Sequence, residues 1–184
     1  SYIKGGKART VDKDLREMKT FKQFINEQIS AKDSLKNWRN EDARLYAEAM
    51  IKKFGQPDEV TETRLLWNAI EPPFDKNWII DESIPHDFPK PHRDYVYSSM
   101  MIPLETDMME SLSHASGSII YDGLTKMVTA RCGSLYANAA TLGFVKKLAE
   151  GEIPYKNKDA VKQAYANAIK KDPLPEWYPN TMGE

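Results

Sequence analysis

The chain has 184 residues, of which 41% are hydrophobic and 29% are charged, and its formal net charge is -1. This near-neutral charge argues against a nucleic-acid-binding protein, because such proteins usually carry a strongly basic patch. The single cysteine excludes an internal disulfide framework and a metal cage built from several cysteines. No apolar run approaches the roughly 20 residues that a membrane-spanning helix needs, so we do not expect a transmembrane protein.

The small net charge hides a segregation of charge along the chain. Residues 1–55 carry 13 basic and 8 acidic side chains, residues 56–122 carry 4 and 13, and residues 123–184 carry 9 and 6. The acidic middle should therefore be offset by basic neighbours. These neighbours are either the two ends of the same chain or a partner.

Two helices are predicted in the N-terminal part. Residues 11–29 have apolar side chains at spacings of three and four, which is typical of one helical stripe with basic residues around it. Such a helix could lie on a membrane surface or an acidic partner, or it could pack on its own domain. Asn40 is a good N-cap for a second helix, which Gly55 should end.

The pattern of apolar residues predicts mainly strands in the middle of the chain and helices in its C-terminal part. Asp122 and Gly123 between two apolar runs predict a hairpin with a loop longer than two residues. The expected strands are 64–68, 77–80, 95–102, 118–121 and 127–130, and the expected helices are 105–113, 135–148 and 158–171.

This order predicts an α+β fold with a mostly antiparallel sheet of four to five strands, two N-terminal helices and two C-terminal helices. We expect a single domain over residues 11–171. An N-terminal arm (1–10) and a C-terminal tail (172–184) should flank it.

The strongest candidate for a metal site is a proline-rich segment, 84–92, which we expect to be irregular because it holds three prolines. It contains His86 and His92, and Asp94 follows it. Imidazole and carboxylate together could bind zinc or iron. However, a spacing of six residues fits neither a helical pair nor alternate positions of a strand. The alternative is a rigid loop whose imidazoles bond to backbone carbonyls.

Cys132 lies between the last predicted strand and a helix. Arg131 and the helix N-terminus would lower the pKa of its thiol and make it a nucleophile. The base for this chemistry would have to be His114. The alternative is a small buried hydrophobic side chain, and we expect no catalytic residue here.

The two ends of the chain are the predicted partner-binding segments. Prolines hold the tail extended, and its aromatic side chains would not be left in water. The tail either folds back on its own domain or docks on another subunit. The candidate contact residues are Tyr2, Ile3, Lys4, Lys7, Leu174, Trp177 and Tyr178.

Several short motifs resemble those of a family of uncharacterised bacterial proteins. They are 54–61 (FGQPDEVT), 66–68 (LWN), 85–94 (PHDFPKPHRD) and 130–132 (ARC). The resemblance covers about residues 40–170. It implies a fold and a bacterial origin, but no reaction.

We therefore expect a non-catalytic accessory subunit, with no cofactor, that docks onto a larger bacterial protein complex. The complex would be associated with a membrane, and the protein periplasmic or membrane-peripheral, with a cytoplasmic location left open. One alternative is a metal-binding protein or an enzyme centred on the His86/His92 segment, with Cys132 or His114 completing the site. Another is a small ligand-binding module that uses the sheet face and its methionines.

Overall fold

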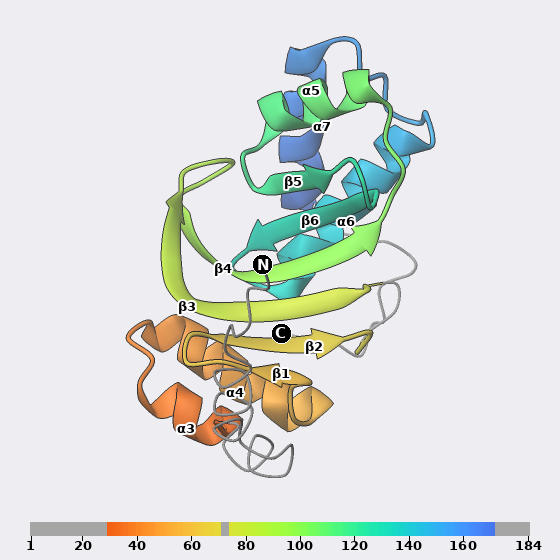
Figure 1. The fold of residues 1–184 in the computed structure, drawn as a ribbon. Coiled ribbons are helices and arrows are strands. Elements are labelled where there is room, and N and C mark those ends of the chain that lie inside the picture. The colour runs from red at the N-terminus through yellow and green to blue at the C-terminus, as the bar shows by residue number, and fades with distance from the viewer. Residues whose placement is uncertain (1–28, 71–73, 172–184) are drawn as a thin grey trace, which may run out of the picture.

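The computed structural model describes residues 29–70 and 74–171 (Figure 1). The helices are α3 (Ala31–Lys36), α4 (Glu41–Phe54), α5 (Thr106–Ala115), α6 (Leu135–Ala149) and α7 (Lys158–Lys171). The strands are β1 (Glu59–Val60), β2 (Arg64–Asn68), β3 (Lys76–His86), β4 (His92–Met101), β5 (Ile119–Asp122) and β6 (Met127–Cys132).

All strand pairs of the sheet are antiparallel, and the strand order is β1-β2-β3-β4-β6-β5. The predicted α+β class is confirmed. The sheet has six strands rather than four or five, because the short β1 adds one at the edge beside β2. The predicted hairpin around Asp122 is also confirmed, as β5 and β6 pair on either side of it.

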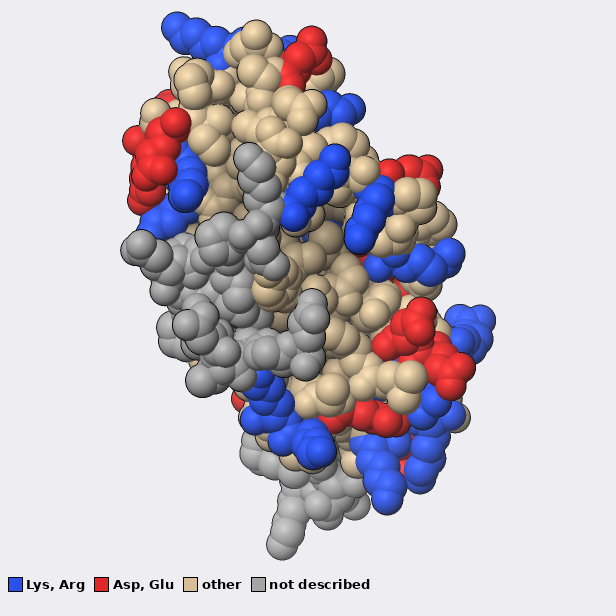
Figure 2. All heavy atoms as spheres, turned by 180° about the vertical axis from the view of Figure 1, so that it is seen from behind, with Lys and Arg blue, Asp and Glu red and all other residues tan. Residues whose placement is uncertain are grey.

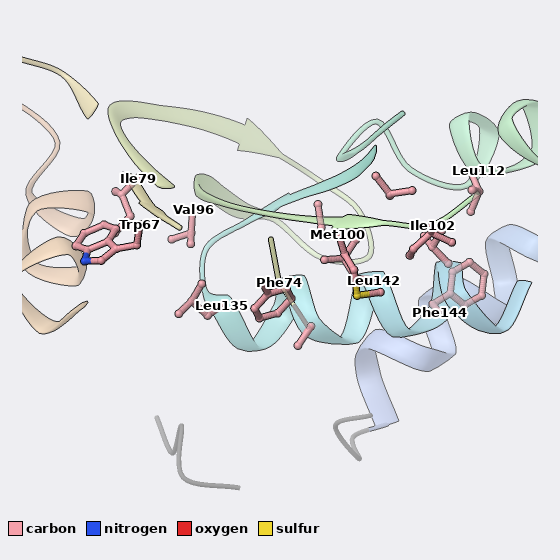
Figure 3. Packing of buried hydrophobic residues seen from close by; sticks show 14 of the residues in the cluster. Trp67, Phe74, Ile79, Val96, Met100, Ile102, Leu112, Leu135, Leu142 and Phe144 are labelled. Atoms are coloured by element: carbon pink, nitrogen blue, oxygen red, sulfur yellow. The ribbon is translucent and has the colours of Figure 1, made fainter. Parts of the chain in front are cut away.

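Helices α4 and α6 cover one face of the sheet (Figure 1). Val128, Ala130 and Cys132 alternate along β6 as its buried residues, so one face of that strand is in the core. Val96 and Met100 of β4 and Leu142 of α6 belong to one cluster of buried hydrophobic side chains (Figure 3). Burial of apolar surface from both layers stabilises their packing.

The N-cap predicted for α4 is confirmed, and α6 has a similar cap that was not predicted. The side chain of Asn40 accepts a hydrogen bond from the backbone N–H of Ala43 at the start of α4. Ser134 caps α6 in the same way. These bonds satisfy backbone donors that the first turn of a helix leaves free.

Helix α7 packs against α5 and α6 at one end of the sheet. Its Tyr165 is almost fully buried and lies edge-on to Phe144 of α6, with 5.3 Å between the ring centroids. On α5, the Ser111 hydroxyl donates to the carbonyl of Tyr155, just before α7, at 2.6 Å. This packing places α7 beside the tip of the β3–β4 hairpin.

The prediction that residues 84–92 are irregular is wrong for both ends of that segment. β3 continues to His86, β4 begins at His92, and only 87–91 form the connecting loop. Pro85 fits in β3 because, among the described strands, only β4 pairs with this end of β3, whereas β2 pairs with β3 no further than Ile80. A proline, which has no N–H to donate, is tolerated at an edge position of a sheet.

Within the described ranges, no helix is long and apolar enough to cross a membrane. The short α3 was not predicted, and the predicted helix at 11–29 lies almost wholly outside the described residues. On the face shown in Figure 2, basic and acidic side chains are interspersed.

Candidate metal site at the tip of the β3–β4 hairpin

The β3–β4 hairpin places its two histidines opposite each other. His86 is the last residue of β3, His92 is the first of β4, and the two are register partners. Their ring centroids are 4.7 Å apart, and 3.2 Å separates His86 Nδ1 from His92 Nε2. A spacing of six residues thus becomes a direct contact, because a five-residue loop closes the hairpin.

Asp94, two residues further along β4, completes a cluster of three side chains. Its carboxylate is fully buried. Oδ1 lies 3.0 Å from His92 Nε2, and Oδ2 lies 3.4 Å from His86 Nδ1. We call these three residues the His–His–Asp cluster; one ligand atom from each lies within 4.8 Å of the other two.

The hydrogen bonds of the cluster leave one carboxylate oxygen without a partner. The Ser118 hydroxyl donates to Asp94 Oδ2 at 3.0 Å. Asp94 Oδ1 is buried and accepts no hydrogen bond from the residues that the structure describes, although His92 Nε2 is 3.0 Å away. Burying a carboxylate oxygen without a hydrogen-bond donor costs free energy, and a nearby positive charge would offset this cost.

The tautomer of His92 explains why its Nε2 does not supply that donor. His92 Nδ1 lies 2.7 Å from the carbonyl oxygen of Lys90, so Nδ1 carries a hydrogen and donates it. In the neutral ring, Nε2 then carries a lone pair and no hydrogen, so it cannot donate to Asp94. A second proton on Nε2 would be directed at His86 Nδ1, with which Nε2 makes its hydrogen-bond contact, and would still leave Asp94 Oδ1 unsatisfied.

The distances in the His–His–Asp cluster match those between the ligands of a transition metal ion. Zinc binds nitrogen and oxygen at about 2.0–2.1 Å, so two ligand atoms of a tetrahedral site are about 3.3 Å apart. His92 Nε2 lies 3.0 Å from Asp94 Oδ1 and 3.2 Å from His86 Nδ1, and His86 Nδ1 lies 3.4 Å from the other carboxylate oxygen, Oδ2. Two imidazoles and a carboxylate are also a common donor set for zinc and for non-haem iron.

Burial lowers the pKa of His86, against the opposing effect of the Asp94 carboxylate. The ordinary value is 6.5, so this ring is neutral near pH 7. A neutral imidazole is the form that binds a metal ion.

Arg131 supplies some positive charge to the site. Its Nε lies 3.8 Å from Asp94 Oδ2, but makes no hydrogen bond there and is itself buried. The guanidinium therefore offsets part of the carboxylate charge on the Oδ2 side. The side chain of Asp94 still lacks a partner at Oδ1.

Helix α7 holds the loop that connects the two histidines. Phe88 in the loop stacks on Tyr165 of α7, with 6.1 Å between ring centroids. The ammonium of Lys162, also on α7, lies 5.1 Å from the centre of the Phe88 ring. These contacts position the hairpin tip from outside the cluster, and the sequence carried no signal for them.

The structure does not support Cys132 as a nucleophile. Burial, followed by the Asp94 carboxylate, raises the pKa of its thiol to about 12. The prediction that Arg131 and the helix N-terminus activate the thiol is therefore wrong, because burial outweighs the guanidinium. His114 is 3.1 Å from Asp159, in a contact between α5 and α7, and is not the base for this thiol.

The predicted partner-binding residues Tyr2, Ile3, Lys4, Lys7, Leu174, Trp177 and Tyr178 lie outside the described residues. Comparisons with protein-family models, curated proteins and solved structures found no match. The resemblance to a bacterial family therefore stays an expectation from its motifs.

Proposed function

We propose that this protein binds one divalent transition metal ion through the His–His–Asp cluster. The observation that carries the proposal is Asp94 Oδ1, a buried carboxylate oxygen that has no hydrogen-bond donor among the described residues and lies beside a histidine lone pair. A cation between these atoms would satisfy all of them at once, and the ligand separations suit one.

The surroundings of the cluster resemble the outer shell of protein metal sites. The Lys90 carbonyl orients His92, and the Ser118 hydroxyl orients Asp94. Such second contacts fix the tautomer and direction of metal ligands. The side chains of His86 and His92 are 18% and 24% exposed, so an ion can reach the cluster from solvent.

Metal analysis of the full chain, purified without chelators, tests this proposal. We expect about one equivalent of zinc or iron in the wild type, and its loss in His86→Ala and His92→Ala. His114→Ala is the matched control, because it removes the third histidine of the chain and lies outside the cluster. Wild-type protein that fails to bind added zinc, or a His114 variant that loses as much metal, would refute the proposal.

The accessory-subunit hypothesis stays a prediction from the sequence. It depends on the arm at 1–10 and the tail at 172–184, which lie outside the described residues. A metal site at the hairpin tip is compatible with it, because a bound ion would rigidify the domain without requiring a reaction.

A further inference from the structure

Cys132 lies close to His92, on the neighbouring strand β6. It is the last residue of β6 and pairs across the sheet with Val96 of β4, two residues beyond Asp94. Its sulfur is 3.8 Å from His92 Nε2. In a tetrahedral zinc site with Zn–S near 2.3 Å, a sulfur and a nitrogen ligand are about 3.6 Å apart.

We infer that Cys132 is the fourth ligand of the metal ion, so that the site is a closed tetrahedral centre of two histidines, one aspartate and one cysteine. The inference rests on the proposed function of the His–His–Asp cluster. As the sulfur–metal bond forms, the thiol releases its proton to solvent and the sulfur binds as a thiolate.

The charges support this ligand set. Two neutral imidazoles, one carboxylate, one thiolate and a divalent cation sum to zero, which is the favourable balance for a buried site. The partly exposed guanidinium of Arg131 lies outside this set. Without the ion, the same place holds a buried carboxylate oxygen that lacks a donor among the described residues, beside the buried side chain of Cys132.

The backbone next to Cys132 brings β6 close to β4. Gly133 allows this approach, because a Cβ at this position would be 3.0 Å from the carbonyl oxygen of Arg93. That is tighter than nine in ten such contacts, so a larger residue would move β6 away from the cluster.

Coordination requires a small inward movement. The group of donor atoms that lie within 4.8 Å of one another comprises His86, His92 and Asp94, and does not include the sulfur. Either the Cys132 side chain or the hairpin tip must close on the ion.

The thiolate also determines which ions the site prefers. Sulfur ligands favour zinc and cobalt over magnesium, calcium and manganese, which prefer oxygen. We therefore expect zinc to displace manganese from the site at equal concentration.

Cobalt substitution of the full chain tests the fourth ligand directly. Wild-type protein with one equivalent of Co²⁺ should show the intense visible bands of a tetrahedral site and a near-ultraviolet band from sulfur-to-cobalt charge transfer. Cys132→Ser should lose the near-ultraviolet band. Its zinc affinity should also fall by more than about 100-fold, because changes to residues outside the ligand set typically lower metal affinity by about 10- to 100-fold. His114→Ala should keep both properties.

The outcomes separate the two proposals. Cobalt that binds through His86 and His92 without a sulfur band in the wild type would overturn the role of Cys132 and leave the His–His–Asp site standing. A wild type that binds no cobalt and no zinc would overturn both. A Cys132→Ser variant with unchanged zinc affinity and an unchanged spectrum would likewise overturn the fourth ligand.

Discussion

Replacing Asp94 by asparagine should remove most of the stability that zinc gives to the protein. Asparagine has nearly the shape of aspartate, and its amide oxygen can still accept a hydrogen bond from Ser118. It lacks the negative charge that Oδ1 offers to a cation. The substitution therefore isolates the metal-binding role of this side chain from its packing.

The magnitude follows from binding linkage. Zinc at 100 times its dissociation constant stabilises the native state by about 2.7 kcal/mol. For a domain of this size, 1 kcal/mol shifts the unfolding midpoint by about 2–4 °C, so the wild type should gain about 5–11 °C. If Asp94→Asn weakens zinc binding about 100-fold, the same zinc concentration supplies only about 0.4 kcal/mol. The shift then falls to about 1–2 °C.

Differential scanning calorimetry of metal-free and zinc-loaded protein measures both shifts. His114→Ala should show the full wild-type shift, because this histidine contacts Asp159 and not the cluster. An equal zinc shift in the wild type and in Asp94→Asn would refute the reasoning. It would mean that zinc binds elsewhere, or that Oδ1 is not one of its ligands.

Three further outcomes are expected. Leu142→Ala should cost about 3 kcal/mol in urea unfolding, because its side chain is fully buried and leaves a cavity, whereas Leu124→Ala at the exposed hairpin tip should change stability by less than about 0.5 kcal/mol. The Thr125 hydroxyl, followed by two backbone N–H groups, holds the pKa of Asp122 below its ordinary 3.8. This carboxylate therefore stabilises the fold above pH 3.8, and the stability difference between wild type and Asp122→Ala should vanish as the pH falls through the lowered pKa; a difference that persists or grows in acid would contradict this. Deletion of residues 172–184 should abolish co-purification with any partner complex if the tail is a docking segment, and unchanged co-purification would count against the accessory-subunit hypothesis.

Much of the fold could be predicted because its signals are local. The N-cap at Asn40 and the apolar spacing of 135–148 specify helices through neighbours three and four residues away. The hairpin around Asp122 likewise depends on a few adjacent residues. The proline-rich segment misled the prediction, because the tolerance of Pro85 in a strand depends on where β2 ends.

The amino-acid sequence by itself determined the α+β class and identified His86, His92 and Asp94 as the residues with metal-binding chemistry. Only the tertiary structure showed that the two histidines face each other, and that Ser118 and Cys132 contact Asp94 and His92, which are 24 and 40 residues away in the chain. The physical reason is that a metal ion can be bound only by donor atoms that lie close together in space. The distances between these atoms are set by strand register and by the packing of α7 on the hairpin loop, which no local pattern encodes.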